Sequence, residues 1–336
     1  MYHVFIMITD IAGFLFCTAL ITYSGTQLSK YGNRLAELTG LSKAWIGLIL
    51  LATVTSLPEL ITGISAVAVL KAPNLAAGNV LGSCAFNLLI LSVLDVMVKK
   101  PITSMVKASH LVTGSFGIIL LCTAAGAILF KHEVPVLLWF SPITVLILAI
   151  YFTAMRSIFL HENANPPGVN KRTDAAGNKK ALLHAISIYS MQAAIVILSA
   201  LFLPYFGEHI AQKTGMGNSF FGTLFLAITT SLPELVISIS ALRIGAVDMA
   251  IGNLLGSNVF NIFVLAINDL FYAEGSLYTA ISETHLLSIL TSVIMTAVVA
   301  IGLTIRPEKK RWYLGQDTFI ILILYIGLMV TFFFRT

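Results

Sequence analysis

Residues 52–66 read ATVTSLPELITGISA, and residues 227–241 read AITTSLPELVISISA. Ten of these fifteen positions are identical, so the two stretches are copies of one unit rather than a chance match. A second pair follows each copy at a similar distance: GNVLGSCAFNLLILSVLD at 78–95 and GNLLGSNVFNIFVLAIND at 252–269, with nine of eighteen positions identical. The chain is therefore organised around two repeats, at 52–95 and 227–269.

The composition places the chain in a membrane. It is 57% hydrophobic and only 10% charged, whereas about a quarter of the residues of a soluble domain are charged. The net charge of +5 comes from basic residues spread between the apolar runs, which favours control of topology over binding of nucleic acid. The sequence predicts an all-α polytopic membrane protein whose main partner is the lipid bilayer.

Ten apolar runs are long enough to cross about 30 Å of hydrocarbon as helices. They lie at residues 6–28, 45–69, 75–98, 110–130, 134–151, 181–203, 220–242, 249–271, 285–305 and 318–334. Between the fifth and sixth runs lies the polar stretch HENANPPGVNKRTDAAGNKK (161–180). The expected organisation is a first five-helix half (1–156), a cytoplasmic linker (157–180) and a second five-helix half (181–336).

The basic residues predict the orientation of these spans. If the N-terminus is outside, sixteen of the twenty lysines and arginines fall in cytoplasmic loops, as the positive-inside rule demands. Both termini are then outside. Because five is odd, the second half enters the membrane upside down relative to the first, and inverted repeats with broken helices are typical of secondary transporters.

The first repeat carries a polar face beside a helix-breaking residue. Pro58 has no N–H, so the carbonyl group of Val54 loses its helical partner and the helix is expected to kink. Thr55 and Ser56 precede Glu59 by four and three residues, which places the oxygen atoms of all three side chains on one helical face. In a membrane, a freed carbonyl group needs another partner, a cavity or an ion.

The second repeat has the same arrangement. Pro233 frees the carbonyl group of Thr229, and the polar face is repeated by Thr230, Ser231 and Glu234. Inversion about the membrane plane is expected to bring the two glutamates toward each other from opposite helices.

The partner helices add hydroxyl and amide groups. Ser83 and Asn87 are four residues apart, as are Ser257 and Asn261, so each pair shares a helical face. The combined donor set is made of carboxylate, hydroxyl, amide and carbonyl oxygen atoms, without histidine or thiolate at matching positions. Such a set suits hard cations such as Ca²⁺ and Na⁺.

A purely structural interpretation explains part of the pattern. Prolines and hydroxyl residues are common as kinks in membrane helices, and Gly78, Gly82, Gly252 and Gly256 are expected to serve close helix packing. It does not explain the glutamates, because an acidic residue at mid-membrane costs on the order of 2.5–3.5 kcal/mol.

Other polar residues are assigned to helix ends. Asp95 and Asp269, which match between the repeats, are expected at helix ends or interfaces. Asp10 and Asp317 are expected to be solvated near the membrane surface. The histidines 110, 184 and 285 lie near the ends of spans and belong to no motif.

TSLPEL followed by GNxxGS, with an asparagine four residues after that serine, in two inverted copies, resembles the repeats of the Ca²⁺/cation antiporter superfamily. Within it the sequence is most similar to the sodium/calcium exchangers. The resemblance implies a central Ca²⁺ site at Glu59 and Glu234 with the carbonyl oxygens of Thr55 and Thr230, and Asn87 and Asn261 between the glutamates. It implies Na⁺ sites formed by Ser56, Ser83, Ser231 and Ser257 and by the carbonyl groups of Ala52 and Ala227. It also implies that the first and sixth helices slide across the rest to alternate access.

Two positions depart from the family pattern. Some prokaryotic exchangers carry an aspartate where Asn261 stands, so this chain has two acidic groups at the site rather than three. Cys84 replaces the amide that Asn258 keeps in the second repeat. The linker is too short to hold the large Ca²⁺-sensor domain that some animal relatives carry.

The sequence thus predicts a Ca²⁺/Na⁺ antiporter that is not an enzyme and uses no cofactor, with the transported ions as its substrates. One alternative keeps the fold and uses H⁺ as the counter-ion, with Glu59 and Glu234 protonated during the return step. A cation channel is an alternative of another class, for which a ring of ligands is expected instead of an inverted, proline-broken pair. Short loops and the lack of a targeting segment favour a prokaryotic inner membrane.

Overall fold

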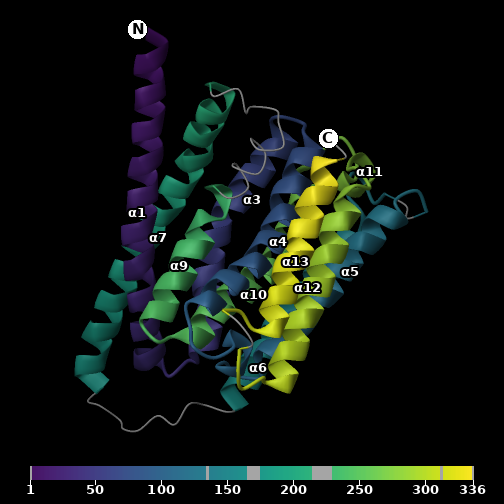
Figure 1. The fold of residues 1–336 in the computed structure, drawn as a ribbon. Helices are drawn as coiled ribbons and strands as arrows, with labels where there is room; N and C mark the ends of the chain where they lie inside the picture. Colours follow the sequence, from purple (N-terminus) through teal and green to yellow (C-terminus); the bar gives the residue numbers. More distant parts are fainter. Residues whose placement is uncertain (1, 134–135, 165–174, 214–228, 311–312, 335–336) are drawn as a thin grey trace.

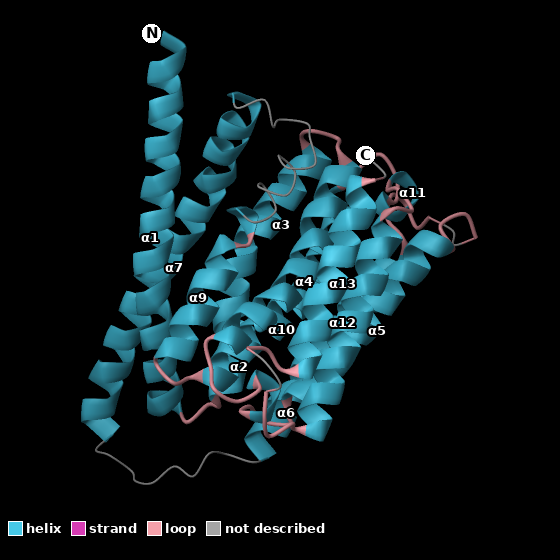
Figure 2. Ribbon diagram, viewed as in Figure 1, coloured by secondary structure: helices cyan, strands magenta, loops and turns pink. Residues whose placement is uncertain are grey.

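The computed structural model describes residues 2–133, 136–164, 175–213, 229–310 and 313–334, and helices and loops make up this part of the chain (Figure 2). Nine of the described helical segments are long and apolar enough to cross a membrane. The elements are α1 (Tyr2–Thr39), α2 (Lys43–Ile46), η1 (Gly47–Leu51), α3 (Ala52–Ala68), α4 (Pro73–Val96), η2 (Ile102–Ser104), α5 (His110–Leu129), α6 (Pro142–Ala164), α7 (Ala175–Lys213), α9 (Leu232–Arg243), α10 (Val247–Phe271), α11 (Leu277–Ala280), α12 (His285–Ile305) and α13 (Gln316–Phe333).

The expected all-helical membrane architecture is confirmed. Of the predicted run 220–242, residues 220–228 lie outside the described residues, and α9 forms the part from Leu232 onward. The amino-terminal end of α1 and the carboxyl-terminal end of α13 lie toward the same end of the bundle (Figure 1). That both termini face the outside remains a prediction.

Two long helices, α1 and α7, pack side by side along one flank of the bundle (Figure 1). At 38 and 39 residues they extend well beyond the predicted spans, and at 1.5 Å per residue each is about 57 Å long. Small and hydroxyl side chains join α1 to α9: Ser29 Oγ donates to the Ile237 carbonyl oxygen at 3.0 Å, and Thr26 lies 3.1 Å from Ser240. The flank therefore contacts the second repeat through these hydroxyl groups and through an apolar cluster in which Ile21 of α1 packs near Leu232 and Val236 of α9.

Helix α10 is the centre of the bundle. It packs against α3, α4, η1 and α9, as well as against α5 and α6, and nearly all of its side chains are buried. Its glycines allow the segment before α3 to approach at backbone distance: a Cβ at Gly252 would lie 2.5 Å from the Ala44 carbonyl oxygen, and one at Gly256 would lie 2.7 Å from that of Leu48. The predicted packing role holds for these two glycines.

The fifth predicted span was misplaced. The sequence predicts a helix over 134–151, whereas α6 begins at Pro142 and continues to Ala164, into the stretch assigned to the linker. The reason is tertiary: the Asp269 side chain of α10 accepts hydrogen bonds from the Ser141 N–H at 2.8 Å and the Thr144 hydroxyl group at 2.5 Å, which fixes the first turn of α6. Proline at the first helical position fits this start.

Asp10 and Asp317 are not solvated, contrary to expectation. Asp10 is 6% exposed, forms an ion pair with Lys213 of α7 and lies 3.4 Å from His209. Asp317 is 7% exposed and accepts a hydrogen bond of 2.5 Å from the Thr103 hydroxyl group. Nearness to a span end does not imply exposure, because neighbouring helix ends cover both carboxylates.

A candidate cation site between the repeats

The two repeat glutamates meet in the interior. Glu59 of α3 is 1% exposed and Glu234 of α9 is fully buried. Ser56, one turn before Glu59, donates a 3.3 Å hydrogen bond to Glu234 Oε1, and the two carboxylates are close enough to interact electrostatically. Within the described structure, both carboxylate oxygens of Glu59 and the second one of Glu234 have no hydrogen-bond partner.

The backbone around the two glutamates is not symmetric. In the first repeat, Pro58 lies inside α3, which continues unbroken to Ala68 after the π-helical turn η1. In the second repeat, the chain leaves helical geometry at Ser231 (φ −93°, ψ 12°), and Pro233 lies in the first turn of α9. The helix is thus interrupted next to the proline in the second repeat, whereas in the first repeat it continues through Pro58.

Hydroxyl groups flank the carboxylates in pairs that join opposite repeats. Thr55 Oγ1 of α3 lies 3.3 Å from Ser257 Oγ of α10, and it donates to the Ala52 carbonyl oxygen at 3.2 Å. Ser231, at the start of α9, donates to Ser83 of α4 at 3.2 Å. Each pair couples one repeat's proline-bearing segment to the other repeat's partner helix.

Three buried amides complete the cluster. Asn87 Nδ2 donates to Asn258 Oδ1 at 3.1 Å, and Asn258 Nδ2 donates to the Cys84 carbonyl oxygen at 3.1 Å. Asn87 Oδ1 and both amide atoms of Asn261 find no hydrogen-bond partner in the described part of the chain. Asn258 therefore orients Asn87. At the equivalent position of the first repeat, the Cys84 side chain makes a 3.9 Å contact from its Sγ to the Asn258 carbonyl oxygen.

The donor set has a clear chemical preference. Unsatisfied carboxylate and amide oxygens at zero exposure are costly unless a cation or water completes them. Among the described residues there is no group of three or more histidine, cysteine, aspartate or glutamate side chains that could hold a metal ion. Two carboxylates with hydroxyl and amide oxygens suit a hard cation.

Ten of the twelve predicted site residues lie buried in this part of the structure. These are Ala52, Thr55, Ser56, Glu59, Ser83, Asn87, Ser231, Glu234, Ser257 and Asn261. Thr230 is half-buried, and Ala227 lies outside the described residues. The assignment of these residues to particular ions remains a prediction.

Sequence reasoning missed a pair of asparagines. Asn253 of α10 donates to Ser238 of α9 at 3.0 Å, and its Oδ1 lies 3.5 Å from the Thr55 hydroxyl group. It therefore links α9 to a predicted site residue of α3. Its counterpart Asn79 donates to Thr62 of α3 at 3.1 Å. The signal was available, because both asparagines follow the first glycine of the second motif.

It also missed a pair of histidine contacts. His110, the first residue of α5, lies 3.2 Å from Asp248 Oδ1 at the second position of α10. His285, the first residue of α12, lies 3.3 Å from Asn74 Oδ1 at the second position of α4. The two contacts correspond between the halves, with the carboxylate of Asp248 in one and the amide of Asn74 in the other.

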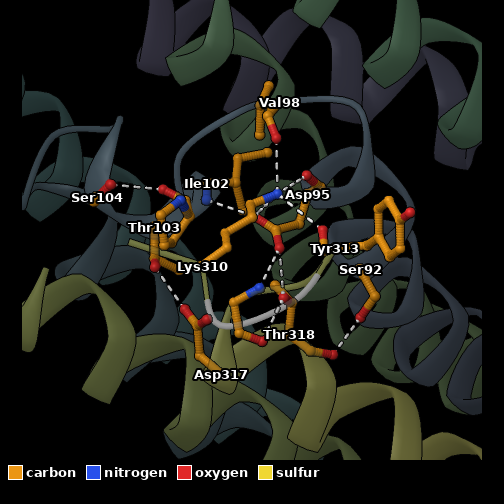
Figure 3. Close-up of polar contacts among 12 residues, drawn as sticks. Ser92, Asp95, Val98, Ile102, Thr103, Ser104, Lys310, Tyr313, Asp317 and Thr318 are labelled. Atoms are coloured by element: carbon orange, nitrogen blue, oxygen red, sulfur yellow. Dashed lines mark hydrogen bonds and ion pairs between the residues drawn. The ribbon is translucent and has the colours of Figure 1, made fainter. Parts of the chain in front are cut away.

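The matching aspartates hold helix ends, as expected. Asp95 of α4 accepts from the N–H groups of Ile102 and Gly315, both at 2.7 Å, and from Thr318 Oγ1 at 2.8 Å, and it forms a 3.2 Å ion pair with Lys310 (Figure 3). Asp269 of α10 accepts from the Leu277 N–H at 2.6 Å besides its bonds to the start of α6. Both carboxylates act at a distance from the site, as anchors of loops.

Comparison with known proteins decides the family. The family model described as sodium/calcium exchanger protein matches residues 9–158 and 184–334. The chain belongs to the sodium/calcium exchanger family. This is a family of ion transporters rather than enzymes, so the chain is a multi-pass membrane transporter of the Ca²⁺/cation antiporter type.

Similar proteins include two curated prokaryotic relatives. The sodium/calcium exchanger MaX1 of Methanosarcina acetivorans is 30% identical over 145 residues, which is 43% of this chain and 39% of that protein. This chain thus matches well under half the length of that exchanger. The putative antiporter CaxA of Alkalimonas amylolytica is 26% identical over 315 residues, or 92% of this chain and 93% of that protein.

Among solved structures, the sodium-calcium exchanger NCX_Mj has the same fold. It superposes with a TM-score of 0.76 at 21% identity, covering 97% of this chain and 99% of that chain. At this identity the likeness concerns the fold alone, and it confirms that the exchanger architecture spans nearly the whole chain.

Proposed function

We propose that this protein is a secondary antiporter that exchanges Ca²⁺ for Na⁺ across a membrane by alternating access. The observation that carries the proposal is the pair of buried carboxylates, Glu59 and Glu234, three of whose four oxygen atoms have no hydrogen-bond partner among the described residues. They lie where helices of the two repeats meet, which is where inverted-repeat transporters hold their substrates. The relative MaX1, whose name is that of a sodium/calcium exchanger, supports the same ions.

In this proposal, Ca²⁺ is bound by Glu59 and Glu234 together with the carbonyl oxygens of Thr55 and Thr230. Na⁺ ions occupy positions formed by Ser56, Ser83, Ser231 and Ser257 and by the carbonyl groups of Ala52 and Ala227, with Asn87 and Asn261 at the centre. The hydroxyl pairs Thr55–Ser257 and Ser231–Ser83 support flanking sites for a monovalent cation, because each pair offers two neutral oxygens beside a carboxylate.

Charge explains why such a site exchanges ions rather than letting one ion pass. Two carboxylates in a low-dielectric interior repel each other, so the site without cations resists the rearrangement that alternates access. One Ca²⁺ or several Na⁺ ions neutralise the pair and permit it. Each turnover then carries one kind of ion in each direction.

Proton coupling is the second candidate. It is favoured by the same Glu59 oxygens, which have no hydrogen-bond partner among the described residues and can accept a proton as well as a cation. It is also favoured by the amide of Asn261, which leaves the site with two carboxylates rather than three. The putative antiporter CaxA, which spans almost all of this chain, has a name that leaves the counter-ion open. A Ca²⁺/H⁺ antiporter needs no other change to the site. The short loops and prokaryotic relatives support an inner-membrane location for either transporter.

The deciding experiment measures uptake of ⁴⁵Ca²⁺ into proteoliposomes. One set is loaded with Na⁺ and diluted into Na⁺-free buffer at matched pH; the other has an acidic interior and no Na⁺. Uptake driven by the Na⁺ gradient supports the proposal, and uptake driven only by the pH gradient replaces it by Ca²⁺/H⁺ exchange. Uptake that needs neither gradient contradicts both and favours a channel.

A further inference from the structure

Helix α10 carries a further buried amide, Asn268, that the proposed site does not use. It lies seven residues, or two turns, beyond Asn261 and so on the same helical face, about 10.5 Å farther along the axis. It is fully buried, and neither of its amide atoms has a hydrogen-bond partner in the described part of the chain. It is thus a polar group in the apolar interior with donor and acceptor both unsatisfied.

The facing helix makes room for this amide. Gly63 of α3 lies one turn beyond Glu59, and a Cβ at Gly63 would come within 2.5 Å of Asn268 Nδ2 and 2.8 Å of its Oδ1. Glu59 and Gly63 on α3 therefore run beside Asn261 and Asn268 on α10, and these two helices pack directly against each other. Because Gly63 has no side chain, the Asn268 amide fits against α3 on the same face of α10 as Asn261.

The other repeat does not have this feature. The position equivalent to Asn268 is Leu94, which is fully buried and apolar, and the position equivalent to Gly63 is Ser238, which accepts a hydrogen bond from Asn253. The extra amide consequently exists on one side of the site only. That side is where α3 and α10 end, beside the exposed ion pair of Lys71 with Glu274, and it is the predicted outer side.

Energetics argue against a packing role. An unsatisfied buried polar group costs about 1–3 kcal/mol, and leucine at the same position would bury more apolar surface without that penalty. A polar side chain placed in the membrane interior at such a cost indicates that it binds a polar species there. Under the proposed function, that polar species is the transported cation with part of its hydration shell.

We propose that Asn268 is a transit ligand on the outer path to the site, whose carboxamide oxygen replaces a hydration water as the cation enters or leaves. This inference rests on the proposed antiport and adds a residue that governs access from one face. Ca²⁺ takes six to eight oxygen ligands, so one amide oxygen eases dehydration without holding the ion. The apolar Leu94 gives the inner path no such intermediate.

The test compares the two faces of the same protein. ⁴⁵Ca²⁺ transport is measured in right-side-out and inverted membrane vesicles, with whichever counter-ion gradient drives the wild type, and a KM for Ca²⁺ is obtained at each face. In Asn268→Leu we expect the KM at the face bearing Lys71 and Glu274 to rise about tenfold and the KM at the opposite face to stay within about twofold. Asn268→Asp should lower the KM at that same face.

Controls separate this role from folding and from the proposed function. Asn268→Ser keeps an oxygen and should give an intermediate KM, which preserves the test if the leucine variant does not fold. The mirror variant Leu94→Asn should leave the KM at the face bearing Lys71 and Glu274 unchanged. If wild-type vesicles transport Ca²⁺ and Asn268→Leu keeps both KM values, or changes both equally or only the opposite one, the transit role is wrong. If wild-type vesicles do not transport Ca²⁺, the proposed function itself fails.

Discussion

Replacing Glu59 by glutamine removes a charge while leaving the shape of the side chain unchanged. Both of its carboxylate oxygens lack a protein partner in the described structure, so the ion-free protein loses no hydrogen bond. The electrostatic repulsion from Glu234 also disappears. We expect the ion-free variant to be at least as thermally stable as the wild type, which is unusual for a change in a buried cluster.

The Ca²⁺-dependent part of stability should behave in the opposite way. Loss of one buried charged partner weakens binding by about 3 kcal/mol, or roughly 160-fold. At a Ca²⁺ concentration 100-fold above its Kd, the wild type gains about 2.7 kcal/mol of stability. At the same concentration the Glu59→Gln variant should gain only about 0.3 kcal/mol.

The assay is thermal unfolding in detergent at low Na⁺, followed by intrinsic fluorescence across a Ca²⁺ titration. Glu37→Gln is the matched control, because Glu37 is an exposed carboxylate on α1 that pairs with Arg34 and Asn33 one turn away, and this variant should keep the wild-type Ca²⁺ shift. A Glu59→Gln protein that melts well below the wild type without ions, or that keeps the full Ca²⁺ shift, would refute the assignment of Glu59 as a cation ligand.

Three further changes test the scaffold. Asp95→Asn should lower unfolding stability by about 3 kcal/mol, since an amide nitrogen would face N–H donors, while transport per folded molecule stays normal; a stable but inactive variant would contradict the anchoring role. Gly252→Ala should destabilise by about 1–3 kcal/mol, seen as a lower melting temperature, because its Cβ meets the Ala44 carbonyl group; unchanged melting would show that the backbones separate freely. Hydrogen bonding from Lys71 holds the pKa of Glu274 below its ordinary value, so any stabilisation is present at neutral pH and lost as the pH falls through that lowered pKa. Because both side chains are exposed, Glu274→Gln should melt like the wild type at physiological salt, and a clear loss there would show a larger role for this loop.

Much of the candidate site could be predicted because it is duplicated. The two TSLPEL segments and the serine and asparagine of each following motif identify chemistry that spacing alone would leave ambiguous. The buried, unsatisfied oxygens of Glu59 agree with that prediction, since an acidic side chain in an apolar helix has few structural uses.

Features that depend on one copy or on a crossing helix could not be predicted. Asn268 has no polar counterpart in the first repeat, so the comparison of repeats passes over it. The contact of His110 with Asp248 joins residues 138 apart, and no local pattern indicates which helix end faces which. The start of α6 escaped prediction for the same reason, because Asp269 of another helix fixes it.

Hydropathy and duplication are properties of residues and their order, so the sequence was enough to predict the membrane class, the inverted repeat and the family, and to single out Glu59 and Glu234 as candidate site carboxylates. Only the tertiary structure decided which oxygens are left unsatisfied, such as those of Glu59 and Asn268, and which carboxylates, such as Asp95, are used up by loops. The physical reason is that hydrogen-bond satisfaction depends on the neighbours that packing brings within about 3 Å, and those neighbours come from distant parts of the chain.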